Sequence, residues 1–134
     1  MIQVGLAGHM SQTITTLQTA ESIGSGTLPV FGTPAVLTLI EKTAWTSVQP
    51  YLTADETTVG ATVNLTHSAP NCVGDTITCE TKLTTVDGRR LTFAARVFDA
   101  AGEVARAEHT RVIVSANRFM KKAEQRSAGA DSKL

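Results

Sequence analysis

The fold of this chain is decided by the stretch VFGTPAVLTLIEKTAW, residues 30–45. Nothing else in the sequence gives a long helical signal. Thr33 followed by Pro34 is typical of a helix start, because threonine can cap free backbone amides and proline fits the first helical position. Pro50 predicts that the helix ends at or just before the preceding residue. The stretch leaves little polar surface, so we expect a helix of about 16 residues, roughly 24 Å long, that is buried.

The sequence puts one carboxylate, Glu41, into this apolar helix. An ionised carboxylate is costly to bury without a partner. We therefore expect one of two arrangements. Either Glu41 reaches a polar edge or pairs with an arginine, or its carboxylate is there for chemistry in an apolar surround that strips away its water.

Length and charge limit the classes of function. A chain of 134 residues fits one domain, and its 12 Lys and Arg balance 12 Asp and Glu. No global field favours nucleic acids or acidic membranes, so we expect neither as a partner. The N-terminus lacks the features of a signal peptide and no stretch approaches a membrane span, which favours a cytoplasmic protein. Cys72 and Cys79 are expected to be free thiols rather than a structural disulfide.

Alternation of apolar and polar residues predicts strands in most of the remaining chain. The clearest case runs from 57 to 67, where Val59, Ala61, Val63, Leu65 and His67 are expected on one face. Asp87-Gly88 is a strong hairpin signal. The expected strands cover 12–20, 57–67, 75–86, 89–99 and 103–115, between a loose leader at 1–11 and a polar tail at 117–134.

A strand, a helix and four strands joined largely by hairpins indicate one α+β domain over residues 12–116. We expect an antiparallel sheet wrapped around one long central helix. The sheet then has one covered face and open edges, which favours pairing with a second copy as a homodimer. The tail is expected to be a frayed helix or disordered.

Short motifs in one order and spacing add a family resemblance. They are Thr33-Pro34-Ala35 with Glu41 eight residues on, Val59-Gly60, His67, Gly88-Arg89-Arg90-Leu91, and Glu108-His109-Thr110-Arg111. Together they resemble the hotdog-fold thioesterases, and specifically the fluoroacetyl-CoA thioesterase-like family, over residues 12–115. Each motif alone is weak, and their joint order makes the resemblance specific.

The resemblance implies an acyl-CoA thioesterase that releases a free acid and CoA. It implies catalytic roles for Thr33, Glu41 and His67, and substrate binding by Gly60 and Arg111. CoA enters as part of the substrate, and no other cofactor and no metal are expected. Residues 24–31, GSGTLPVF, depart from the aromatic-bearing lid of the fluoroacetyl-selective enzyme. Thioester hydrolysis is therefore expected here, and fluoroacetyl selectivity is not.

Thioester chemistry gives each residue a reason to be present. A thiol leaves readily, so the main needs are an attacker and a place for the developing oxyanion. Glu41 is expected to act as a nucleophile or as a base for water. His67 is expected to serve as acid–base or to orient Glu41 and Thr33, and Thr33 to cap the helix and hold the thioester oxygen or relay a proton.

Each of these roles has a plainer alternative. His67 could be an ordinary core histidine, and Gly60 a strand glycine at a bulge rather than a gap that admits substrate. Arg111 could bind an acyl carboxylate or a CoA phosphate, or could only pair near Glu108 on the surface.

Helix geometry also constrains the site. Eight residues place Thr33 and Glu41 roughly 12 Å apart along the axis, too far for both to reach one carbonyl directly. We therefore expect a site at a dimer interface with groups from both chains. The rival function is a non-hydrolytic acyl-thioester binding or sensing protein on the same fold. A hydratase is disfavoured because the Asp-x-Asn-Pro-x-His motif is absent.

Overall fold

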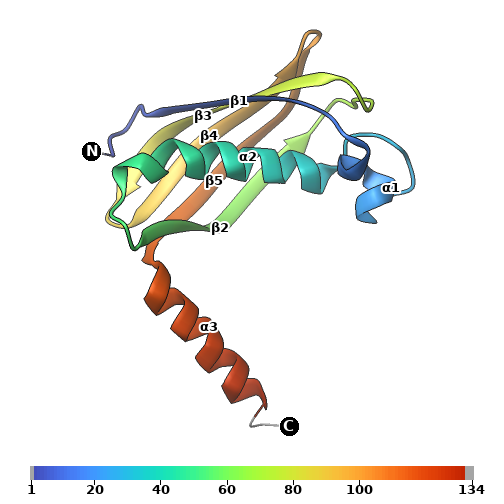
Figure 1. Ribbon diagram of the computed structural model, residues 1–134. Helices are drawn as coiled ribbons and strands as arrows, with labels where there is room; N and C mark the ends of the chain where they lie inside the picture. Colours follow the sequence, from blue (N-terminus) through green and yellow to red (C-terminus); the bar gives the residue numbers. More distant parts are fainter. Residues whose placement is uncertain (1, 132–134) are drawn as a thin grey trace.

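The computed structural model describes residues 2–131, and its centre is one five-stranded antiparallel sheet (Figure 1). The strand order is β1-β3-β4-β5-β2, so β1 and β2 are the edges. The strands are β1 (Ala7–Thr13), β2 (Glu56–His67), β3 (Thr76–Asp87), β4 (Arg90–Asp99) and β5 (Gly102–Ser115). The predicted α+β class and the four later strands are confirmed. No helix within residues 2–131 is long and apolar enough to cross a membrane.

The long helix α2 (Thr33–Val48) lies across one face of this sheet, as Figure 1 shows. Its buried residues repeat every three to four positions and form a face towards the sheet. They are Ala35, Val36, Leu39, Ile40, Thr43, Ala44 and Val48. Trp45 is 39% exposed, so the helix is covered on one side only and not buried all round as expected. A 3-10 turn, η2 (Gln49–Tyr51), follows it and contains Pro50.

The start of α2 differs from the expectation in one respect. Gly32, not Thr33, is the N-cap, and no side chain caps this end. Thr33 is already the first helical residue, so its hydroxyl is free for another partner. An added Cβ at Gly32 would lie 3.1 Å from backbone atoms of Ala20, which explains a small residue there.

The N-terminal strand is the main correction to the predicted fold. The chain from Ala7 to Thr13 is β1, paired with β3, and is not part of a loose leader. The expected strand over 12–20 is wrong beyond Thr13, since a 3-10 turn, η1 (Thr16–Gln18), and a short helix, α1 (Ala20–Ile23), follow. The threonines that suggested a strand act as caps instead. Thr19, for example, accepts a hydrogen bond from the Ser22 amide at the start of α1.

A bulge in β2 decides which of its residues face the helix. Gly60 pairs with Arg111 and Thr62 pairs with Thr110, so Ala61 is an extra residue without a partner across the sheet. Up to Gly60 the even-numbered residues face α2, and from Val63 the odd-numbered ones do. The expectation that Val59 shares the face of His67 is therefore wrong, because simple alternation does not allow for the bulge.

The C-terminal segment forms a helix, α3 (Ala116–Asp131), that projects from the end of β5 away from the sheet (Figure 1). This confirms the helical option for the tail over its described part, and residues 132–134 lie outside the described residues. Phe119 and Met120 are 40% and 55% exposed, so they do not anchor the helix to the domain.

Candidate active site

Two groups of polar side chains lie between α2 and the sheet, and the first joins Thr33 to His67. Thr33 begins α2 and His67 ends β2, and Thr33 Oγ1 is 2.9 Å from His67 Nδ1. The ring of Phe31 meets the imidazole edge-on at a centroid distance of 6.4 Å. A hollow of about 260 Å³ opens beside this pair, lined by Val30, Phe31, His67, Ser68, Ala69 and Pro70.

Burial sets the protonation state of His67. It lowers the pKa of the imidazole below the ordinary value of 6.5, and the backbone of Ala69 offsets only part of the effect. The ring is therefore mainly neutral at pH 7. With Nδ1 as the acceptor, a neutral imidazole takes a hydrogen bond from the Thr33 hydroxyl, which is the arrangement of a base beside an alcohol.

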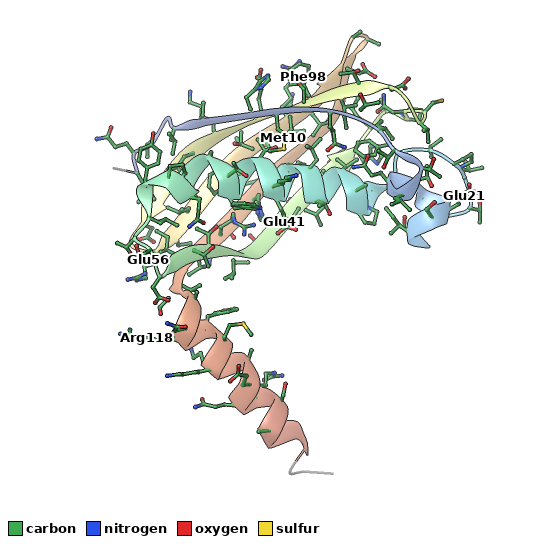
Figure 2. All side chains as sticks on the ribbon, viewed as in Figure 1. Met10, Glu21, Glu41, Glu56, Phe98 and Arg118 are labelled. Atoms are coloured by element: carbon green, nitrogen blue, oxygen red, sulfur yellow. The ribbon has the colours of Figure 1, made fainter. Side chains whose placement is uncertain are left out.

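The second group is built around an ion pair between Glu41 and Arg111. Glu41 Oε2 lies 3.1 Å from Arg111 Nη1. The Glu41 side chain is 38% exposed, whereas that of Arg111 is only 6% exposed. Figure 2 shows Glu41 on the side of α2 that faces β2. Of the two arrangements expected for Glu41, the structure shows the pairing with an arginine; the alternative, a purely apolar surround, is wrong, since a buried guanidinium contacts the carboxylate.

Arg111 is fixed by several hydrogen bonds besides the ion pair. Its Nε donates to Thr58 Oγ1 at 2.8 Å, and its Nη2 donates to the Thr58 carbonyl at 3.0 Å. Nη1 also donates to His109 Nε2 at 3.1 Å. Burial lowers the pKa of the guanidinium and Glu41 opposes that shift, and an arginine remains charged in either case. Most of its donors are thus committed within the protein.

Gly60 makes room for the carboxylate of Glu41. A Cβ added at Gly60 would lie 2.7 Å from Glu41 Oε2 and 3.5 Å from Arg111 Nη1. The φ angle of Gly60 is not positive, so the backbone itself would accept another residue. The glycine is therefore favoured for steric reasons, because a Cβ at this position would crowd the carboxylate of Glu41 on α2.

Two of the five predicted site residues, Thr33 and Glu41, lie on α2, and the other three lie on the face of the sheet that packs against it. They form two groups: Thr33 with His67, and Glu41 with Gly60 and Arg111. Roughly 12 Å of helix separates the groups, as the residue spacing predicts. The role of each residue in catalysis stays a prediction. The alternative that Arg111 only pairs near Glu108 on the surface is wrong. Arg111 is buried and faces α2, whereas Glu108 is exposed on the other face.

Two residues of the second group, Thr58 and His109, were not predicted as site residues. His109 is fully buried and holds Arg111, and Thr58 accepts two of the arginine's hydrogen bonds. The signal for His109 was present in the sequence, since it stands two residues before Arg111 and so shares its face of the strand. No such signal existed for Thr58, because its contact depends on the register between β2 and β5.

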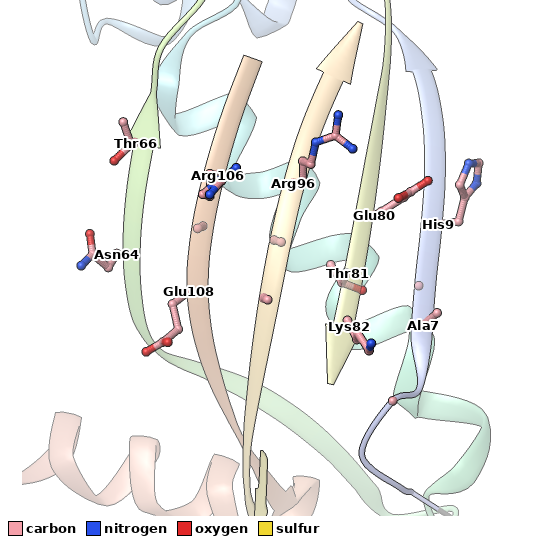
Figure 3. A pocket seen from close by; sticks show the side chains of 15 residues that line it. Ala7, His9, Asn64, Thr66, Glu80, Thr81, Lys82, Arg96, Arg106 and Glu108 are labelled. Atoms are coloured by element: carbon pink, nitrogen blue, oxygen red, sulfur yellow. The ribbon is translucent and has the colours of Figure 1, made fainter. Parts of the chain in front are cut away.

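A larger hollow lies elsewhere, on the outer face of the sheet, which is the face away from α2. It has a volume of about 900 Å³, and none of the five predicted site residues lines it. Figure 3 shows Arg96, Arg106 and Glu108 spread over this face. Arg96 and Arg106 lie within ion-pair distance of Glu103 and are largely exposed. These charged side chains of the hollow are therefore solvated. Among residues 2–131, no three His, Cys, Asp or Glu side chains gather as a metal site.

Comparison with known proteins gives a family match over most of the chain. The model of the fluoroacetyl-CoA-specific thioesterase family matches residues 14–117. The fluoroacetyl-CoA thioesterase of Streptantibioticus cattleyicolor is 30% identical over 98 residues, covering 73% of this chain and 70% of that protein.

Solved structures show the same fold. One of a fluoroacetyl-CoA thioesterase has a TM-score of 0.89 at 24% identity, covering 93% of this chain and 97% of that one. A hot-dog-like protein from Thermanaerovibrio acidaminovorans has a TM-score of 0.86 at 25% identity, covering 93% of both chains. The fold is thus the hotdog fold, and the chain belongs to the fluoroacetyl-CoA-specific thioesterase family.

Proposed function

We propose that this protein is a homodimeric acyl-CoA thioesterase that hydrolyses a small acyl thioester to the free acid and CoA. The observation that supports this most is the Glu41 carboxylate, held at the edge of a buried arginine cluster on the same face as the Thr33–His67 pair. Family membership gives the reaction class, and the geometry gives each residue a position suited to it. The substrate supplies CoA, and the reaction as proposed uses water and no metal.

Glu41 supplies the attack in this mechanism. As a general base, its carboxylate takes a proton from water while the water oxygen bonds to the thioester carbon. As a nucleophile, it bonds to that carbon itself and forms an anhydride that water then opens. In both routes the C–S bond breaks from a tetrahedral intermediate and the sulfur leaves as a thiolate, which needs little acid assistance. Arg111 orients the carboxylate through the 3.1 Å contact.

Thr33 and His67 serve the oxygen of the same carbonyl, and because roughly 12 Å of helix separates Thr33 from Glu41 within one chain, the attacking Glu41 comes from the second copy. The Thr33 hydroxyl, at the N-terminus of α2, is placed to donate to the oxygen of the tetrahedral intermediate, where the helix dipole also favours negative charge. For this role His67 is the Nδ1–H tautomer, which donates to Thr33 Oγ1 across the 2.9 Å contact and leaves the hydroxyl hydrogen free for the oxygen of the intermediate. Burial lowers the pKa of His67, so the ring is mainly neutral at pH 7 and can adopt this tautomer.

A second copy is proposed to complete the site. Strand β2 is an edge of 12 residues with unpaired backbone groups on its outer side. Beside it lie exposed apolar side chains, with Val63 36% and Trp45 39% exposed. Burying this strip against the same strip of a partner would enclose Glu41 and bring residues of both chains to one thioester. The cysteines, both free, fit a cytoplasmic location.

The acyl group is proposed to be small, without the fluoroacetyl selectivity that the name of the Streptantibioticus relative records. The segment before α2 supports this, because its residues 24–29 are exposed and carry no aromatic side chain. Its one aromatic residue, Phe31, is 1% exposed and packs against His67 instead of forming a lid.

The test is thiol release from a panel of short, branched and aromatic acyl-CoAs. Wild type, Glu41→Ala and a matched control, Glu56→Ala, are compared; Glu56 pairs with exposed Arg89 at 3.1 Å, away from the site. We expect turnover in wild type and Glu56→Ala and its loss in Glu41→Ala. Turnover that survives in Glu41→Ala would refute the mechanism. Tight binding of acyl-CoA without turnover by the wild type would favour the non-hydrolytic binding or sensing protein.

A further inference from the structure

His109 has no role in the mechanism above, yet it lies at the centre of the arginine cluster. It is on β5, two residues before Arg111, and its side chain is completely buried. Its ring stacks on Phe93 with a centroid distance of 6.3 Å and an interplanar angle of 30°. A buried histidine needs hydrogen-bond partners, and both of its ring nitrogens have one.

These two partners decide where the ring carries its proton. Nδ1 lies 2.8 Å from the carbonyl oxygen of Thr62, and a carbonyl can only accept, so Nδ1 bears the hydrogen. Nε2 lies 3.1 Å from Arg111 Nη1, and a guanidinium can only donate, so Nε2 presents its lone pair. The ring is therefore the neutral Nδ1–H form.

The surroundings favour the same neutral form. Burial lowers the pKa of His109 below 6.5, and the charge of Arg111 lowers it further. The Thr62 carbonyl and Glu41 oppose this shift without cancelling it. If the ring were protonated, its Nε2 would have no lone pair to accept the hydrogen bond from the Arg111 guanidinium. The cluster therefore requires the neutral imidazole.

The hydrogen bond to His109 Nε2 constrains Arg111 Nη1, which is also the nitrogen that contacts the Glu41 carboxylate. Arg111 Nη1 donates both to Glu41 Oε2 and to His109 Nε2, each at 3.1 Å. Thr58 fixes the opposite side of the guanidinium. We propose that His109 is a positioning residue, which as a neutral Nδ1–H imidazole fixes Arg111 Nη1 and through it the carboxylate of Glu41. Its effect on turnover rests on the proposed function; its contact with Arg111 does not.

Three substitutions separate this role from simple packing. In His109→Gln the amide oxygen can occupy the Nε2 position and still accept from Arg111. In His109→Asn the shorter amide can still donate to the Thr62 carbonyl but cannot reach Arg111. In His109→Phe the ring and its stacking on Phe93 remain and both hydrogen bonds are lost.

We expect kcat to fall roughly 10- to 100-fold in His109→Asn and His109→Phe, as for the loss of a hydrogen bond to a charged group. KM should change little, because His109 does not touch the substrate. His109→Gln should lose clearly less. Val97→Ala, a core truncation on β4, controls for lost stability. A His109→Phe enzyme with wild-type kcat, or kcat losses that merely follow the fall in melting temperature as in Val97→Ala, would overturn the proposal.

A second measurement does not depend on turnover. The nitrogen chemical shifts of the His109 ring at pH 7 should report a protonated Nδ1 and an unprotonated Nε2. The Arg111 Nη1–H signals, from the group that donates to His109 Nε2, should stay protected from exchange in His109→Gln and lose protection in His109→Phe. An Nε2–H ring, a charged ring, or equal protection in both variants would refute the contact. If the wild type hydrolyses no acyl-CoA, the proposed function fails, and these signals still decide the role of His109.

Discussion

Replacing Gly60 by alanine tests the geometry of the site most directly. The new Cβ would lie 2.7 Å from Glu41 Oε2, whereas ordinary contact begins near 3.4 Å. The carboxylate must therefore retreat by about 0.7 Å, and it can, because it is the end of a flexible side chain. The same movement takes it from its contact with Arg111 Nη1. Misplacement of a reacting group by about 1 Å can cost roughly 100-fold in rate.

Stability should respond in the opposite direction. Gly60 has no positive φ, so alanine fits the backbone without strain. Removing a glycine from the unfolded chain stabilises the folded state by about 0.4–1 kcal/mol, which offsets the small cost of moving the carboxylate. We expect Gly60→Ala to keep or raise the melting temperature while kcat falls between about 10- and 100-fold.

The assay is thiol release at saturating acyl-CoA, with thermal unfolding measured on the same samples. Gly129→Ala on α3 is the matched control, since an added Cβ there meets nothing within 4 Å. In a Glu41→Ala background, Gly60→Ala should cause no further loss, because both changes act through one carboxylate. Full activity in Gly60→Ala, or a loss that is additive with Glu41→Ala, would show that the glycine does not act by making room for Glu41.

Three further predictions concern assembly, pH and thiol chemistry. If the proposed dimer forms through the β2 edge, Val63→Lys should convert it to an inactive monomer, measured by light scattering. Val86→Lys, at a similarly exposed valine on the β3–β4 hairpin, should leave the dimer intact. A dimer that persists in Val63→Lys would place the interface elsewhere. Because burial lowers the pKa of His67 from 6.5, the unfolded state binds more protons than the folded state. The free energy of unfolding, measured in urea, should therefore fall as pH drops below about 6.5, and it should fall less steeply in His67→Gln. Equal slopes in the two proteins would contradict this. Burial raises the pKa of Cys79 to about 11, whereas Cys72 is exposed. A thiol reagent should therefore react with one thiol per native chain and with two after unfolding. Rapid reaction of both thiols in the native protein would contradict the burial of Cys79.

The sequence predicts the local elements well where one physical signal dominates. Pro34 and Pro50 bracket the long helix, and its observed bounds, Thr33–Val48, differ from the expected ones by one residue. The Asp87-Gly88 turn and the alternation on either side place β3 and β4 within a residue of their expected limits. The N-terminal strand was misplaced because threonine favours both strands and helix caps, and only the pairing with β3 distinguishes them.

The sequence suggests candidate site residues but not the contacts that join them. The spacing places Thr33 and Glu41 on one helix, and their separation follows from helix geometry alone. The partners depend on tertiary register: the Thr33 hydroxyl turns to His67 because Gly32 takes the cap position. The pairing of Glu41 with Arg111 joins residues 70 positions apart, and one chain's sequence without aligned relatives gives no signal for it.

The bulge in β2 leaves a record in the spacing of the chain. Gly60 and His67 are seven positions apart, an odd number, yet both face α2 because Ala61 is left out of the pairing. In a regular strand an odd separation would put two residues on opposite faces. A relative of unknown structure that keeps this odd interval between its glycine and its histidine therefore carries the extra residue as well. One in which the interval is even has either lost the bulge or moved one of the two groups out of the site.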